Sequence, residues 1–355
     1  MRSARAPTIV TAALALVLIV SGCGGGSPAA RTTATQPLPG VGRPTVLLGD
    51  MNTPEQFVIG ELYEAALTHE GYTVALDRNI GTASVRAAAL GKGTLDIYPE
   101  YIGVWDSQVA GLSRRFRTLA AAYDAGQRYA RREHLALLKP TRFSDTAGLA
   151  VLTSYAAEHH IQTIGNLRRV QGQLTIGAPL DFSAFPSGLP SVDRAYALRP
   201  HAIVPVNIGL QYIELRLHQI EAAYVFTSDG QLSQQQYKLL RDPENVFGFG
   251  NVVPVTSDNA IAAEGPAFAA TINRVDALLS TSAMRGLNAE VQLGRHTPQT
   301  VAVEFLEGNG LLPQAVWPTT LTTTTTTAST ATQPRHAKHR LSRNRRHRAA
   351  KTRAR

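Results

Sequence analysis

Residues 45–98 read TVLLGDMNTPEQFVIGELYEAALTHEGYTVALDRNIGTASVRAAALGKGTLDIY and decide the fold class. The run begins with an apolar stretch, residues 45–49, that is typical of a short buried strand. Residues 53–56, Thr-Pro-Glu-Gln, then combine a capping residue, a proline for the first helical position and a glutamine for the reciprocal cap. They predict a helix that ends at Gly71, because glycine readily adopts the left-handed backbone found after helices.

The same alternation continues along the chain. We expect a strand at 74–76, a helix at 82–90 and a strand at 95–98. A second set of strands and helices follows between residues 147 and 226 and ends with a strand at 222–226. A strand from residue 252 with further helices completes the pattern. Strands that alternate with helices of 10–15 residues indicate parallel sheets, so the sequence predicts an α/β fold.

Three predicted strands end in polar or aromatic residues, at 49–52, 98–104 and 226–230. In open parallel sheets, ligands lie at the carboxyl ends of strands. Two of these ends belong to the first α/β set and one to the second. The sequence therefore predicts a ligand cleft between two α/β halves.

The amino-terminal segment has the composition of an export signal. Two arginines precede an apolar run of twelve residues, 9–20, which is short for a membrane span of about 20 residues. Val20-Ser21-Gly22-Cys23 follows and resembles the lipobox of bacterial lipoproteins, in which Cys23 becomes the lipid-modified first residue. The alternative is an ordinary signal with a chance cysteine. We expect a lipoprotein signal peptide at 1–22 and a flexible Gly/Pro/Thr linker at 23–44.

Residues 317–355 form a Thr-rich and then basic segment, which we expect to be disordered because it offers little apolar surface to bury. The whole chain has a net charge of +9, of which ten positive charges fall in 335–355 and two in 1–22, leaving −3 for 23–334. The basic character thus belongs to the tail. For an exported protein, anionic lipid or wall polymer is a better partner for it than nucleic acid, and a solvated tail without a partner is an equal alternative.

Catalytic, cofactor and metal motifs are not recognisable. His159-His160 lacks the spacing and companion ligands of a zinc site. Gly91-Lys92-Gly93 lacks the surrounding spacing of a phosphate-binding loop. Cys23 is the only cysteine, so disulfides within the chain are excluded. We expect that the protein is not an enzyme and that it binds neither a cofactor nor a metal.

Five stretches together resemble one known family. They are 49–105, beginning GDMNTPEQ and ending DIYPEYIGVW; 144–168, beginning SDTAGLAV; 175–190, TIGAPLDFSAFPSGLP; 220–232, IEAAYVFTSDGQL; and 285–312, beginning RGLNAEVQ. In this order they are similar to the periplasmic substrate-binding proteins of ABC importers for glycine betaine, choline and related osmoprotectants. The resemblance covers essentially all of 45–313.

This resemblance implies a two-lobed periplasmic-binding-protein fold of type II, whose lobes close on the ligand by hinge motion. We expect 45–144 with 252–316 to form the first lobe and 145–251 the second, with crossings near 144–147 and 250–253. It also implies a monomer that delivers a small quaternary amine or zwitterion to a permease and its ATPase subunit. The alternative is the same scaffold turned into an envelope sensor or another non-transport lipoprotein with a different ligand.

In the family, aromatic rings surround the quaternary ammonium group, because a methylated cation has no hydrogen bonds to donate and is attracted to π faces. The residues expected at the ligand site are Tyr101, Phe226, Asn52, Gln56, Asp145, Thr146 and Phe249. Tyr98, which alternates with Ile97, is expected in the core instead. Five positions depart from the family's pattern and leave the ligand's identity open: Met51, Val104, Ala147, Phe185 and Gly250. The resemblance implies a tyrosine at the positions of Ala147 and Gly250.

Overall fold

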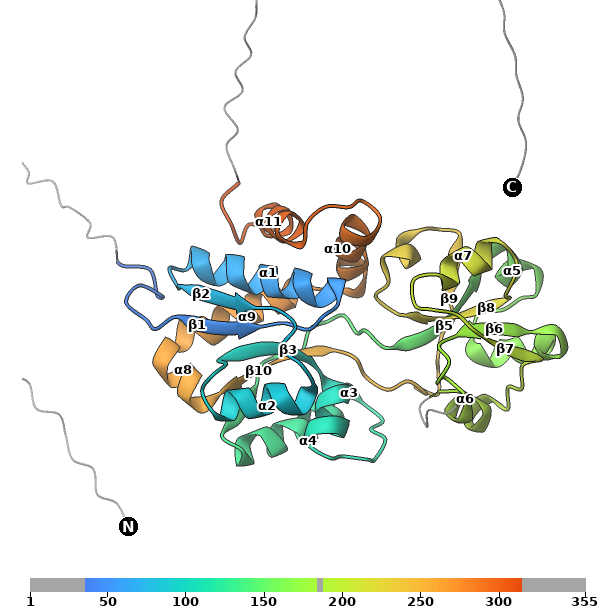
Figure 1. The fold of residues 1–355 in the computed structure, drawn as a ribbon, viewed down its shortest axis with the longest axis horizontal. Coiled ribbons are helices and arrows are strands. Elements are labelled where there is room, and N and C mark those ends of the chain that lie inside the picture. Colours follow the sequence, from blue (N-terminus) through green and yellow to red (C-terminus); the bar gives the residue numbers. More distant parts are fainter. Residues whose placement is uncertain (1–35, 184–187, 315–355) are drawn as a thin grey trace, which may run out of the picture. The chain divides into compact units, whose positions relative to one another are not determined.

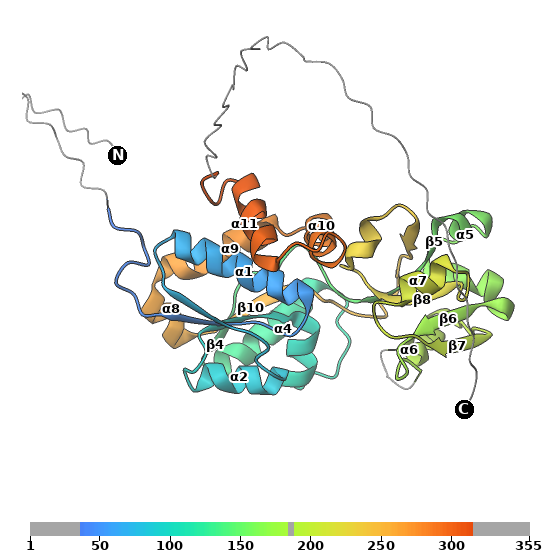
Figure 2. The ribbon, with the colours of Figure 1, turned by 45° about the horizontal axis from the view of Figure 1, so that its top comes forward.

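The computed structural model describes residues 36–183 and 188–314, which are drawn in colour in Figure 1 and, from another side, in Figure 2. The predicted signal segment with Cys23, most of the predicted linker, Phe185 and the segment 317–355 lie outside these residues. Within the described part of the chain, no helix is long and apolar enough to cross a membrane.

The first sheet has the strand order β2-β1-β3-β10-β4. Its strands are β1 (Val46–Gly49), β2 (Val74–Asp77), β3 (Ile97–Tyr101), β4 (Leu135–Leu137) and β10 (Val252–Ser257). β1 runs parallel to β2 and β3, whereas β10 is antiparallel to both β3 and β4. A strand from late in the chain is thus inserted between two early ones.

Helices cover both faces of this sheet (Figure 1). Ile97 packs with α1 (Pro54–His69), α9 (Pro266–Leu278), α10 (Thr281–Gln292) and α11 (Pro298–Gly308). Its neighbour Tyr98 packs on the opposite face with α2 (Ala83–Gly91) and α4 (Leu119–Arg132). Successive strand residues point to opposite faces, so two buried neighbours require two cores. Tyr98 is fully buried, which confirms its predicted place in the core.

The second sheet has the order β7-β6-β8-β5-β9. Its strands are β5 (Ala147–Leu152), β6 (Thr175–Ala178), β7 (Ala202–Pro205), β8 (Ala222–Phe226) and β9 (Tyr237–Leu239). β6 is parallel to β7 and β8, and β5 is antiparallel to β8 and β9. The accompanying helices are α5 (Thr153–Glu158), the 3-10 helix η2 (Ile164–Gln173), α6 (Leu189–Tyr196), α7 (Gln211–Arg216) and the 3-10 turn η3 (Gly230–Ser233).

The chain passes between the sheets twice, from β4 to β5 and from β9 to β10. The two passing segments are hydrogen-bonded to each other. The Asp145 amide donates to the Gly250 carbonyl at 2.9 Å, and the Gly250 amide donates to the Ser144 hydroxyl at 3.0 Å. The crossings near 144–147 and 250–253 are therefore held together directly, and the exact lobe limits remain a prediction.

The carboxyl-terminal helices also contact the second sheet's loops. α8 (Asp258–Glu264) leads into α9, and α10 packs against η3. The contact is so close that a Cβ on Gly230 would lie 2.6 Å from the Ala289 amide nitrogen. Only a residue without a side chain allows this approach of two backbones.

The predicted elements are recovered with shifted ends. The strand predicted at 222–226 is observed with the same limits, and the one predicted at 95–98 is observed at 97–101. The later strand end arises because β10 pairs with β3 as far as Tyr101, which lies opposite Val252. Tyr101 is therefore the last residue of a strand rather than a loop residue. Residues 102–109 continue as the short helix α3 (Ile102–Val104) and the π-helical turn η1 (Trp105–Val109).

Candidate ligand-binding site

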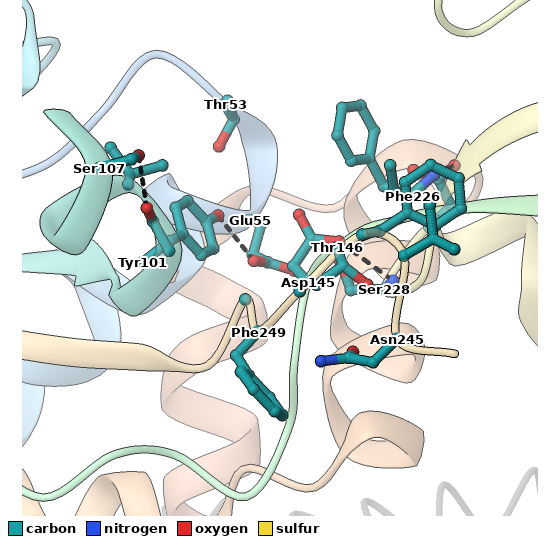
Figure 3. Close-up of a pocket in the computed structure, with 18 of the residues that line it drawn as sticks. Thr53, Glu55, Tyr101, Ser107, Asp145, Thr146, Phe226, Ser228, Asn245 and Phe249 are labelled. Carbon is teal, nitrogen blue, oxygen red and sulfur yellow. Dashed lines mark hydrogen bonds between the residues drawn. The ribbon is translucent and has the colours of Figure 1, made fainter. Parts of the chain in front are cut away.

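A cavity of about 1390 Å³ lies where β3, α1, the two crossings and the loop after β8 meet. Figure 3 shows several of the side chains that line it. Five residues predicted for the site are on its wall: Tyr101, Asp145, Thr146, Phe226 and Phe249. The wall does not include Asn52, which is exposed, or Gln56, which is fully buried behind it.

Tyr101 is fixed by a carboxylate from the first turn of α1. The tyrosine hydroxyl donates to Glu55 Oε1 at 2.8 Å (Figure 3). Thr53 caps the helix by accepting the Gln56 amide at 3.3 Å, and Pro54 occupies the first turn, so the local sequence places Glu55 at the helix amino terminus. An acid is favourable there because the helix dipole is positive at that end. The hydrogen bond leaves the tyrosine ring as part of the cavity wall.

Glu55 is also bound from the far end of the chain. Asn288 on α10 donates its Nδ2 to Glu55 Oε2 at 3.0 Å and to the Ser228 carbonyl at 2.9 Å. Glu55 is 5% exposed. Burial raises the pKa of Glu55, and the hydrogen bonds from Ser228, Tyr101 and Asn288 oppose that shift.

Asp145 lies on the first crossing beside this network. Its Oδ1 accepts the Ser228 amide at 3.3 Å, which joins the crossing to the loop after β8 (Figure 3). Burial, followed by the negative charge of Glu55, raises the pKa of Asp145 well above its ordinary value. Thr146 is held nearby, since its amide donates to the Thr227 hydroxyl at 2.9 Å.

Phe226 ends β8 and forms an edge-on contact with Tyr224, with ring centroids 5.7 Å apart. Directly opposite it in the sheet is Ala147. Ala147 stands where the family's pattern has a tyrosine, and the small side chain leaves the cavity open next to the Phe226 ring. Phe226 is thus a ring of the cavity wall contributed by the second sheet.

Phe249 supplies a ring from the second crossing, and the adjacent Gly250 cannot. A Cβ on Gly250 would lie 1.8 Å from the Asp145 carbonyl oxygen. No side chain fits there in this backbone arrangement, so a tyrosine at 250 is excluded by the contact between the crossings. Phe249 and Phe247 both line the cavity beside it.

Three acids on the cavity wall were not predicted as site residues: Glu55, Asp106 and Asp229. Asp229 accepts the Tyr212 hydroxyl at 2.8 Å and the Phe226 amide at 3.0 Å. Glu55 had a recognisable signal, namely an acid at a helix start that directly follows a strand end. The hydrogen bond between Asn288 and Glu55 had no signal in the sequence, because the two residues are 233 positions apart.

Asp106 is 4% exposed, and neither of its carboxylate oxygens has a hydrogen-bond partner among the described residues. Burial raises its pKa to about 7, with Arg114 opposing the shift. It belongs to the π-helical turn η1, and a Cβ on Gly126 of α4 would lie 2.7 Å from its Oδ1. The glycine therefore makes room for this carboxylate.

The cavity wall also carries three arginines. Arg115 donates to the Val246 carbonyl at 2.7 Å, Arg114 stands over the Phe116 ring at 4.7 Å, and Arg194 lies on α6. No ion pair between an arginine or lysine and Glu55, Asp145 or Asp229 is found among residues 36–183 and 188–314.

Within the same residues, no group of three or more His, Cys, Asp or Glu side chains is arranged to hold a metal ion.

Residues 44–308 match the protein family described as the substrate binding domain of ABC-type glycine betaine transport systems. The chain belongs to this family. It is 29% identical over 279 residues to the glycine-betaine-binding protein of Pseudomonas aeruginosa, covering 76% of this chain and 89% of that protein. It is 27% identical over 281 residues to the carnitine transport binding protein OpuCC of Listeria monocytogenes, covering 77% of this chain and 90% of that protein.

The fold agrees with this membership. The crystal structure of a glycine betaine/carnitine/choline ABC transporter has a TM-score of 0.70 to this chain at 23% identity, covering 75% of this chain and 99% of that one. The predicted two-lobed α/β fold of type II binding proteins is confirmed. As a substrate-binding protein of an ABC importer, the chain is a transport component rather than an enzyme, as its sequence indicated.

Proposed function

We propose that this substrate-binding protein takes a small organic cation of the quaternary ammonium class, such as choline or glycine betaine, into the cavity at Tyr101. The observation that carries the proposal is the combination of rings with buried negative charge. Tyr101, Phe226 and Phe249 line the same cavity as the carboxylates of Glu55 and Asp145. Rings and carboxylates both stabilise a positive charge that has lost its water.

Delivery to a membrane permease follows from the family. The ligand would bridge the walls contributed by the two sheets, and the closed form would dock on the permease that a separate ATPase subunit drives. The hydrogen bonds between the crossings at Asp145 and Gly250 support hinge closure, since they keep the passing segments together while the lobes move. We propose that the protein acts as a monomer on the outer face of the cell membrane.

Calorimetric titration with choline and with 3,3-dimethylbutan-1-ol tests the proposed ligand class. The two molecules have nearly the same shape, but only choline is charged. We expect heat and thermal stabilisation with choline, and with glycine betaine or carnitine if a zwitterion is accepted, but none with the neutral alcohol. Equal responses to choline and the alcohol, or no response to any cation, would contradict the proposal.

Variants at Tyr101 separate the ring from the hydroxyl. Tyr101→Ala is expected to weaken cation binding about 2- to 30-fold, since one desolvated cation–π contact contributes about 0.5–2 kcal/mol. Tyr101→Phe keeps the ring and should bind more tightly than Tyr101→Ala. Tyr155→Ala removes a ring that is outside the cavity and serves as the matched control. Equal affinities of Tyr101→Ala and the unaltered protein would exclude Tyr101 from the site.

Membrane attachment through a lipid on Cys23 is the second part of the proposal, and it rests on the lipobox-like sequence alone. Cys23→Ser is expected to move the protein from the membrane fraction to the soluble exported fraction, because one thiol is the only acceptor for the lipid. Metabolic labelling with a radioactive fatty acid measures the modification directly. Incorporation of the radioactive fatty acid into the Cys23→Ser variant would contradict lipid attachment at Cys23. Deletion of 319–355 controls for attachment through the basic segment.

A further inference from the structure

Glu55 and Asp145, two acids of the cavity wall, accept hydrogen bonds from uncharged groups only. Glu55 accepts from the Tyr101 hydroxyl and the Asn288 amide, and Asp145 accepts from the Ser228 backbone amide. Glu55 is buried and Asp145 is half-buried, and both are on the cavity wall. The described part of the chain places no Lys or Arg within ion-pair distance of either. The pair is thus a largely buried negative charge that the protein's own cations leave uncompensated.

The surrounding charged groups do not remove this imbalance. Asp229, on the loop after β8, is a third acid whose pKa is raised by burial. Arg285 on α10 opposes that shift, and its Nε donates to the Thr227 carbonyl. The remaining titratable groups around the cavity are Tyr101, Tyr212, Tyr224, Asp106, Arg114, Arg115 and Arg194. Arg115 is engaged with a backbone carbonyl, and Arg114 with the Phe116 ring.

Two neighbouring, largely buried carboxylates without a counter-ion do not both stay ionised, because each charge destabilises the other. Burial raises the pKa of both groups, and the Glu55 charge raises that of Asp145 further. Asp145 has the weaker set of donors, because its hydrogen bonds come from Ser228 alone and the one from the Ser228 amide is 3.3 Å long, whereas Glu55 also accepts bonds of 2.8 and 3.0 Å from Tyr101 and Asn288. The shared proton therefore belongs mainly on Asp145.

We infer that the Glu55–Asp145 pair holds one proton when the cavity is empty and releases it to solvent when a cationic ligand binds. This inference rests on the proposed function, since it requires a ligand with a positive charge. Proton and cation then compete for the same negative charge. A ligand with a net charge of +1 displaces the proton, whereas a neutral molecule of the same shape does not.

The competition has a defined direction with pH. Below the pKa of the pair, each cation that binds must displace a proton, so affinity falls by up to about tenfold for each pH unit lowered. Above that pKa the pair is already ionised, and affinity becomes independent of pH. Choline should therefore bind more weakly in acid, while the charge of choline itself does not change.

Calorimetry of choline binding between pH 5 and 8, in buffers with different enthalpies of ionisation, counts the protons released. The expected number rises towards one where affinity depends on pH. Asp145→Asn should release almost none and bind with an affinity that no longer varies with pH. Asp276→Asn is the matched control: Asp276 is also a buried acid with a raised pKa, but it bonds Tyr63 outside the cavity and should leave proton release unchanged.

Infrared spectroscopy of the ligand-free protein measures the proton independently of any ligand. A carboxylic-acid C=O band near neutral pH that disappears in Asp145→Asn and is retained in Asp276→Asn is the expected result. Absence of a band that depends on Asp145 would overturn the inference. Choline binding without proton release would also overturn it while leaving the proposed function intact. If no cation binds, the proposed function fails, and the infrared band alone decides where the proton lies.

Discussion

Replacing Gly250 by alanine is expected to lower the free energy of unfolding by about 2–4 kcal/mol, because an added Cβ overlaps the backbone of the opposite crossing. The nearest atoms would be the Asp145 carbonyl oxygen at 1.8 Å and the carbonyl carbon at 2.3 Å. Backbone cannot turn away as a side chain does, so the crossings must separate. The two hydrogen bonds between them would weaken at the same time. Denaturant unfolding followed by circular dichroism measures the loss.

Gly286→Ala provides the matched control for this substitution. Gly286 lies within α10, and a Cβ there would meet no atom within 4 Å. We expect this variant to be more stable by about 0.5–1 kcal/mol, because alanine favours the helix over glycine. An unchanged free energy of unfolding for Gly250→Ala would mean that Gly250 does not lie against the Asp145 carbonyl. Cation affinity measured on the same variants would report whether the separated crossings also disturb the cavity.

Asp106→Asn is expected to increase stability above neutral pH, where the unaltered protein must bury an ionised carboxylate without a partner. Burial raises the pKa of Asp106 from 3.8 to about 7. Between these values the native chain holds a proton that the unfolded chain has lost, so the native protein loses stability as pH rises through this window. The side-chain amide of the Asp106→Asn variant does not ionise in this pH range, so the variant does not lose stability in this way. The stability difference between variant and unaltered protein should therefore grow from about pH 4 and level off above about pH 7, at about 2–4 kcal/mol.

Urea unfolding at several pH values measures this difference. Other buried acids, such as Asp50, whose pKa burial raises to about 6, are present in both proteins and cancel. Asp124→Asn removes a charge from the exposed face of α4 and is expected to change stability by less than about 0.5 kcal/mol. A constant difference across the pH range for Asp106→Asn would show that Asp106 is ionised throughout or is exposed to water.

Local sequence was sufficient for the class of fold. Residues 53–56 carry their own helix start. The capping hydrogen bond to Thr53 is observed, but the predicted reciprocal bond from the Gln56 side chain is not formed. Strand β8 was predicted with its observed limits because a short apolar run followed by polar turn residues is a local signal. The limits of β3 were missed by two residues or more, because β10 extends it through pairs with residues more than 150 positions away. Pairing over such separations leaves no local pattern.

The same distinction holds at the cavity. Tyr101 and Phe226 were predicted from family motifs and Phe249 from its place beside Gly250, and all three line the same cavity. Asn52 and Gln56 were predicted as possible polar contacts, yet Asn52 is exposed before helix α1 begins, and Gln56 is buried in the first turn of that helix. Glu55 lies between them in sequence and is the side chain that faces Tyr101. Helical geometry places neighbours in sequence on different sides, so adjacency alone did not identify the polar contact.

Local sequence patterns were enough for the α/β class, because helix caps and short apolar runs act over a few residues. The resemblance to the family added the binding-protein role and the prediction of aromatic rings at the ligand site. How the cavity is charged follows only from the tertiary structure. Glu55, Asp145, Ser228 and Asn288 come from four distant segments and share one set of hydrogen bonds. Their electrostatics depend on the water that these segments exclude together, and exclusion of water is a property of the packed molecule.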